Sequence, residues 1–234
     1  MSSPWIIWTV PRTGGTNLSA ALKSLSERPA AEDEPFQFGD NPRQFSGVYE
    51  RWRRRPSAIG ELSSICEVGW CIKHIPESFD DAFNIALAQE TERAGYRHIH
   101  LTRRDEFARL ISRDVAEQLN AWEARDAFPL IHEILAGRHR LHPLDVPHLI
   151  VNKRLGEHRW RMIRPHLSNV VEITTEEIII DPGFIIQRLA LVLGLDCESA
   201  AKTLPAQGQD TKRIWHLIPN LDELRAALKA EDGA

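Results

Sequence analysis

The segment from Trp5 to Leu25, WIIWTVPRTGGTNLSAALKSL, constrains the fold of this chain more than any other. It opens with an apolar, aromatic and β-branched run over residues 5–10, which is short enough for one buried strand. Pro11 ends this run, and a tight glycine-rich loop follows over residues 12–16. Apolar residues then recur at the spacing of one helix face, namely Leu18, Ala21, Leu22 and Leu25. The segment therefore predicts a strand, a loop and a helix in direct succession.

This succession predicts an anion-binding site. Gly14 and Gly15 allow successive backbone N–H groups to converge, and the start of the helix adds unpaired donors and the positive end of a dipole. Such a nest most often binds a phosphate. The loop is not a Walker A sequence, because no Gly-Lys-Ser/Thr follows the glycines and its cation, Arg12, precedes them. An ordinary glycine-rich turn is the alternative.

The composition is that of a soluble globular protein. With 234 residues, of which 42% are hydrophobic and 26% charged, the chain suits a single α/β domain over residues 1–234. A net charge of −4 provides no basic field for nucleic acid. No apolar run approaches the roughly 20 residues of a membrane span, and the N-terminus predicts no signal peptide. Three cysteines without a CxxC pair indicate reduced thiols in a cytoplasmic protein.

Strand and helix patterns alternate along the chain. Strands are expected at residues 5–10, 69–74, 97–102 and 170–174. Helices are expected at residues 18–25, 79–94 with Ser78 as cap, 107–122, 129–136, 147–167 and 182–193, and an Asn220–Glu223 capping box predicts a last one. Residues 27–57 predict irregular structure with at most short helical turns. The basic run Arg51–Arg55 within them is either a solvated helix face or an arginine patch for an anionic substrate or the donor. The alternation predicts a three-layer α/β fold in which helices flank a central, mainly parallel sheet.

The residues from Pro11 to Leu18 resemble the 5′-phosphosulfate-binding loop of sulfotransferases that use 3′-phosphoadenosine-5′-phosphosulfate (PAPS). In that family a Pro-Lys/Arg-Ser/Thr-Gly-x-Thr segment follows the first strand of a P-loop-like domain. The resemblance implies that Arg12 contacts the sulfuryl donor and its departing 5′-phosphate. It also implies that a short run of backbone, with one threonine hydroxyl, cradles this phosphate; the run is Thr13, Gly14, Gly15, Thr16 and Asn17.

A second segment resembles the same family. Arg104 follows a predicted strand and Ser112 lies eight residues later, the spacing at which an arginine and a serine bind the donor's 3′-phosphate in the family. A guanidinium offers a charge-assisted fork, to which the hydroxyl adds a hydrogen bond. The chain departs from the family's common Arg-Asn-Pro by having Arg-Asp-Glu. Arg103, Arg109 and Arg113 are competing cations, and Arg103 is an alternative to Arg104. For the family's basic loop over the nucleotide, Lys212 and Arg213 are the candidates, with surface charge as an equal alternative.

An acceptor hydroxyl needs a base within about 3 Å. Glu34, in Glu-Pro-Phe, resembles the Glu-x-Phe region that provides the base in bacterial carbohydrate sulfotransferases. An exposed loop acid is the alternative reading of Glu34, and Asp40, Glu50 and His74 are the other candidates for the base. Lys73 could contact the donor, the acceptor or neither.

These resemblances imply a sulfotransferase that moves a sulfuryl group from PAPS to a hydroxyl of a carbohydrate or small-molecule acceptor and releases 3′,5′-ADP. No metal is expected, because cations and oriented N–H groups can stabilise the charge on the leaving oxygen. A P-loop nucleotide kinase or NTPase and a non-catalytic nucleotide-binding module are the alternatives. The sequence leaves the acceptor and the oligomeric state open.

Overall fold

The computed structural model describes residues 2–38, 43–55, 59–122, 124–200 and 211–233. The chain divides into two compact units, each described by itself. The first consists of Met1–Thr102 with Gly156–Pro205, and the second of Arg103–Leu155 with Ala206–Ala234. That the whole chain forms a single domain stays a prediction.

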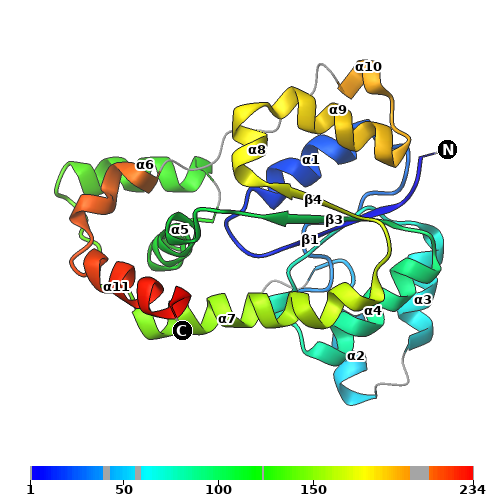
Figure 1. Ribbon diagram of the computed structural model, residues 1–234, viewed down its shortest axis with the longest axis horizontal. Helices are drawn as coiled ribbons and strands as arrows, with labels where there is room; N and C mark the ends of the chain where they lie inside the picture. Colours follow the sequence, from blue (N-terminus) through cyan, green and yellow to red (C-terminus); the bar gives the residue numbers. More distant parts are fainter. Residues whose placement is uncertain (1, 39–42, 56–58, 123, 201–210, 234) are drawn as a thin grey trace. The chain divides into compact units, whose positions relative to one another are not determined.

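The first unit is built around a four-stranded parallel sheet (Figure 1). Its strands are β1 (Trp5–Thr9), β2 (Ile72–His74), β3 (Arg97–Thr102) and β4 (Val170–Thr174), in the order β2-β1-β3-β4. Its helices are α1 (Gly15–Leu25), α2 (Ser46–Arg54), α3 (Ile59–Val68), α4 (Asp81–Arg93), α8 (Thr175–Ile180), α9 (Pro182–Leu193) and α10 (Cys197–Ala200), with short 3₁₀ turns η1 (Pro76–Ser78) and η2 (Arg164–His166). All four predicted strands and their parallel arrangement are confirmed.

Helices cover both faces of this sheet, because the fully buried strand β1 is apolar on both sides. Trp5 and Ile7 face a cluster that includes residues of α1 and α9, such as Leu18, Leu22, Ile186 and Leu189. Ile6 and Trp8 point the opposite way, as successive residues of a strand must. They join a cluster that draws residues from α2, α3 and α4, such as Trp52, Leu62, Phe83 and Leu87. The predicted three-layer α/β architecture is confirmed.

Irregular structure is the wrong prediction for residues 46–54, which form α2. Its charged composition conceals one apolar face made by Val48, Tyr49 and Trp52, all of which are buried. Trp52 thus anchors the basic run Arg51–Arg55 to the core. The arginines beside it face solvent, where Arg51 forms a bidentate contact with Glu61 of α3.

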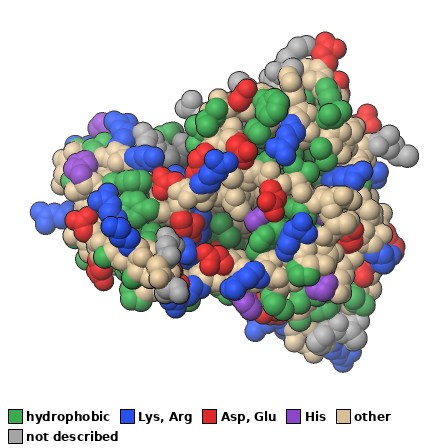
Figure 2. All heavy atoms as spheres, viewed as in Figure 1, with side chains coloured by type: hydrophobic (Ala, Val, Ile, Leu, Met, Phe, Trp, Pro, Cys, Tyr) green, Lys and Arg blue, Asp and Glu red, His purple; other side chains and the backbone are tan. Residues whose placement is uncertain are grey.

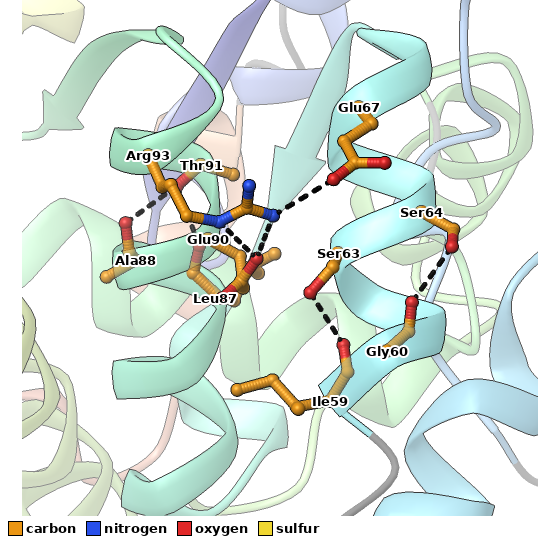
Figure 3. Close-up of polar contacts among 10 residues, drawn as sticks. All are labelled: Ile59, Gly60, Ser63, Ser64, Glu67, Leu87, Ala88, Glu90, Thr91 and Arg93. Carbon is orange, nitrogen blue, oxygen red and sulfur yellow. Dashed lines mark hydrogen bonds and ion pairs between the residues drawn. The ribbon is translucent and has the colours of Figure 1, made fainter.

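Helices α3 and α4 lie side by side and are linked by one arginine (Figure 3). Arg93 of α4 lies 2.6 Å from Glu90 on its own helix and 3.3 Å from Glu67 on α3. Within each helix, serine and threonine hydroxyls donate back to carbonyls of the preceding turn, as Ser63 does to Ile59. Since Arg93 and Glu67 are half exposed, we attribute the pairing of the helices mainly to their buried apolar residues.

Two helix starts differ from the prediction. Asp80, rather than Ser78, caps α4, because its carboxylate accepts a hydrogen bond from the backbone N–H of Phe83 (2.8 Å). Ser78 instead ends the 3₁₀ turn η1. In the second unit, α6 begins at Ala124, so that Pro129 lies inside the helix instead of opening it.

The predicted capping box at Asn220 is also wrong. The Asn220 side chain pairs with the backbone of Leu144, accepting from its N–H (2.7 Å) and donating to its carbonyl (3.0 Å). A capping box does form at the start of α8, where Thr174 and Glu177 exchange hydrogen bonds. The side chains of Asn and Thr can form hydrogen bonds either with nearby backbone groups or with groups elsewhere in the chain, and the sequence pattern alone does not distinguish the two.

The second unit is helical and has its own core. It contains α5 (Glu106–Leu119), α6 (Ala124–Leu135), the 3₁₀ segment η3 (Thr211–Leu217) and α11 (Leu221–Asp232), and α7 (Val146–Ile163) has residues in both units. Its buried cluster draws on each of these elements, for example Leu110, Ile131, Leu149, Ile214 and Leu224. The apolar face predicted for α5 is therefore confirmed, except that the helix ends at Leu119 and leaves Trp122 exposed.

Charges of both signs are mixed on the face of the molecule drawn in Figure 2. Lys and Arg side chains alternate there with Asp and Glu, in agreement with a net charge of only −4. Among the described residues, no helix is both long and apolar enough to cross a bilayer.

Candidate active site

The loop between β1 and α1 turns at a glycine in the left-handed region and leads directly into the helix. Gly14, at φ 81°, lies in the left-handed region that glycine adopts without strain, and α1 begins at the next residue. Gly14 has no side chain, so the N-cap position makes no side-chain hydrogen bond to the first turn of the helix. A Cβ atom placed on Gly14 would meet no heavy atom within 4 Å, which means that the loop faces open space.

Arg12 precedes these glycines and has a strained backbone. Its φ of 71° is uncommon for a residue with a side chain. Such strain costs about 1–3 kcal/mol and clusters at functional sites. Sequence reasoning selected Arg12 for its charge, and its backbone conformation is an independent indication of function.

Thr13 fixes the loop to the sheet. Its hydroxyl is buried between Thr9 (2.5 Å) and the carbonyl of Val10 (3.0 Å), and its own carbonyl accepts from Thr175 of α8 (2.8 Å). The Thr13 side chain is therefore structural, and only its backbone can serve the predicted cradle. Thr16, by contrast, is exposed on the first turn of α1.

Lys73 of β2 joins this loop to the segment that carries Glu34. Its ammonium donates to the Thr16 hydroxyl (2.7 Å) and lies 3.0 Å from the Glu34 carboxylate and 3.6 Å from that of Asp33. The register of the sheet explains this position, because Lys73 pairs with Ile7 on β1, a few residues before the glycine loop. Three residues that sequence reasoning considered separately thus meet at one point.

A buried phenylalanine holds Glu34 in place. Phe36 is fully buried and packs edge-on against Phe83 and His74, with ring centroids 5.4 and 6.1 Å apart. The turn before it is closed by a hydrogen bond from Gln37 N–H to the Glu34 carbonyl (2.9 Å). Glu34 itself has a φ of 54°, and its side chain stays 23% exposed, so that an acceptor can reach it.

The other candidates for the base are less suited to the role. Asp40 lies outside the described residues, and Glu50 points to solvent from α2. His74 is fully enclosed in aromatic side chains, and its Nε2–H donates to Asn84 Oδ1 (2.8 Å). Burial lowers the pKa of His74 to about 4, and this histidine is accordingly a neutral core residue at pH 7.

The buried His74 and the half-buried His100 predict a loss of stability in mild acid. Burial lowers the pKa of His74, and that of His100, to about 4, whereas an unfolded histidine titrates near pH ~6.5. Below pH ~6.5 the unfolded chain therefore binds protons that the folded chain does not, and stability falls toward pH 4, by about 3 kcal/mol for His74 alone. Urea unfolding between pH 7 and 4.5 should show a shallower decline for His74→Gln than for the wild type; parallel curves would contradict this.

The second unit contains the residues predicted to bind the 3′-phosphate. Arg104 is exposed and lines an open depression of about 680 Å³, together with Phe107, Lys153, Arg225 and Lys229. Ser112 is buried in α5. Arg109, a competing cation on the same helix, is buried and paired bidentately with Glu106 (2.8 and 2.6 Å).

Lys212 and Arg213 are both exposed on η3. Lys212 lies 3.8 Å from Asp105, the neighbour of Arg104, and 5.6 Å from the ring of Trp215. That these two residues bind the nucleotide stays a prediction. Within the described part of the chain, no group of three or more His, Cys, Asp or Glu could hold a metal ion.

Comparisons with known proteins complete this description. No protein-family model matches the chain, and no curated protein matches it in sequence. Among solved structures it is similar to a sulfotransferase from Alicyclobacillus acidocaldarius, with a TM-score of 0.49 and 14% identity over 99% of this chain and 93% of the other. So distant a likeness decides neither the family nor the activity, which have to be argued from the residues themselves.

Proposed function

We propose that this chain is a sulfotransferase that moves a sulfuryl group from PAPS to a hydroxyl of a carbohydrate or small-molecule acceptor. The observation that supports it most is the meeting of an anion nest with a carboxylate. The nest is the strained Arg12–Gly14 loop at the start of α1, and Glu34 is joined to the same helix turn through Lys73. A donor phosphate and an acceptor base are what sulfuryl transfer needs in one place.

In the proposed reaction the acceptor oxygen attacks sulfur while its proton passes to Glu34. A new bond forms between that oxygen and sulfur, and the bond from sulfur to the 5′-phosphate oxygen breaks. The electron pair of the broken bond stays on 3′,5′-ADP. Arg12 and the N–H groups of residues 13–17 stabilise this developing charge, a role that oriented donors fill without a metal.

At the far end of the donor we assign the 3′-phosphate to Arg104 and Ser112, and the rest of the nucleotide to Lys212 and Arg213. The exposed guanidinium of Arg104, beside Lys153, Arg225 and Lys229 in the depression, supports the part of Arg104. The part of Ser112, which is buried in α5, rests on the resemblance alone. We also propose a cytoplasmic location, which the free thiols of Cys66, Cys71 and Cys197 support.

Two other functions share the nest. A nucleotide kinase or NTPase would use it for ATP with Mg²⁺, but the loop lacks the Gly-Lys-Ser/Thr sequence that such enzymes use. A non-catalytic module would bind a nucleotide without transferring any group. The carboxylate held beside the nest favours the sulfotransferase over both.

A thermal-shift experiment separates the three functions. We expect 3′,5′-ADP without Mg²⁺, at a hundredfold excess over its Kd, to raise the Tm by about 5–10 °C. Arg104→Ala should halve this shift, because the loss of one charge-assisted contact weakens binding about tenfold. A preference for Mg-ATP would instead indicate the kinase, and binding of 3′,5′-ADP without any transfer from radiolabelled PAPS would indicate the module.

A further inference from the structure

Lys73 is a charged residue in a place where charges are uncommon. It belongs to a strand of the central sheet, all three residues of which are buried, and only 3% of its surface is exposed. A buried ammonium is tolerated only where it is paired and hydrogen-bonded. The groups that pair with the Lys73 ammonium and offset the cost of its burial are therefore needed for a lysine at this position.

These groups come from two segments that are distant in the sequence. The Thr16 hydroxyl belongs to the first turn of α1, and the Glu34 and Asp33 carboxylates belong to the segment after it. An ammonium has three N–H donors and no acceptor. The Thr16 and Glu34 oxygens, at 2.7 and 3.0 Å, lie within hydrogen-bond distance of these donors, and the Asp33 carboxylate, at 3.6 Å, adds a second opposite charge.

We propose that Lys73 is a positioning residue, which holds the Glu34 carboxylate against the donor loop and acts on the reaction through Glu34. This inference depends on the function proposed for the site. Lys73 is suited to the role because its backbone is fixed in the sheet by pairing with β1. Phe36 fixes the backbone near Glu34, and Lys73 fixes its carboxylate.

The geometry also distinguishes Lys73 from Arg12. The Lys73 ammonium is enclosed and directed at Thr16 and two carboxylates, whereas the Arg12 loop opens to solvent at Gly14. Lys73 thus contributes by fixing a base at the distance that proton transfer requires. Small displacements of such a group reduce the rate strongly, by up to about a hundredfold for 1 Å.

The test compares Lys73→Met with Lys23→Met. Lys23 lies 3.2 Å from Asp33 on the same segment, so its replacement removes a neighbouring cation and leaves the Lys73–Glu34 contact in place. We expect Lys73→Met to lower kcat about 30–100-fold, with the KM for PAPS and the affinity for 3′,5′-ADP within threefold of wild type. Lys23→Met should retain kcat within threefold.

A double-mutant cycle with Glu34→Gln decides how Lys73 acts. If it acts through Glu34, Lys73→Met should change the residual kcat of Glu34→Gln less than threefold. A full effect in that background, or a tenfold loss of 3′,5′-ADP affinity, would mean that Lys73 contacts the donor and would overturn the proposal. Lys73→Gln, which retains a hydrogen-bond donor, serves if Lys73→Met does not fold. A wild-type chain that binds 3′,5′-ADP but transfers no sulfuryl group would overturn the proposed function first, and this inference with it.

Discussion

We expect the replacement of Arg12 with alanine to abolish the proposed sulfuryl transfer and to leave the fold intact. We expect kcat to fall at least about 1,000-fold, or about 4 kcal/mol, because Arg12 is the cation proposed to face the charge that develops on the leaving oxygen. The fold should persist, since Thr13 and the buried strand β1 hold the loop. The measurement is transfer from radiolabelled PAPS, with urea unfolding of the same preparation.

Arg12→Gly is the matched control for the backbone. Glycine adopts a φ of 71° freely, so this variant should be about 1 kcal/mol more stable than Arg12→Ala. Both variants should be equally inactive, because both lack the guanidinium. Full activity in either variant would contradict the catalytic role of Arg12 and would favour the alternative that the loop is an ordinary glycine-rich turn.

Replacing Glu34 with glutamine should lower kcat by about 10²–10⁴, the range that a general base contributes. Glutamine has the same shape, so the segment should stay anchored by Phe36 and the affinity for 3′,5′-ADP should change little. The single-turnover rate of sulfuryl transfer and the affinity for 3′,5′-ADP should be measured on the same variant. Together they distinguish a slower chemical step from weaker binding of the donor.

Glu32→Gln is the control for this substitution. Glu32 is an exposed acid two residues earlier, and its carboxylate accepts a surface hydrogen bond from the backbone N–H of Gln44 (3.1 Å). This variant should keep wild-type kcat. Equal losses in the two variants would indicate a general effect of acidic charge near the site, and would argue against Glu34 as the base.

Local patterns were sufficient for the regular elements that carry a strong apolar period. The strand β1, the glycine loop and the helix α1 follow from the order of residues 5–25 alone, because each depends on neighbours within one or two turns. The same holds for β3 and for α9, with Asp181 at its start and Gly194 at its end. Helix α2 was missed because charged residues outnumber the apolar ones in its sequence, and the burial of Trp52 is a tertiary property.

The sequence by itself determined the α/β class, the anion nest and the identity of Arg12 and Glu34 as candidates. Only the tertiary structure decided that Lys73 meets Thr16 and Glu34, and that His74 is a core residue rather than a base. The physical reason is that both outcomes depend on which strand lies beside β1. Parallel pairing of β2 with β1 brings together segments that are far apart in the chain. Local sequence patterns do not predict which strands pair.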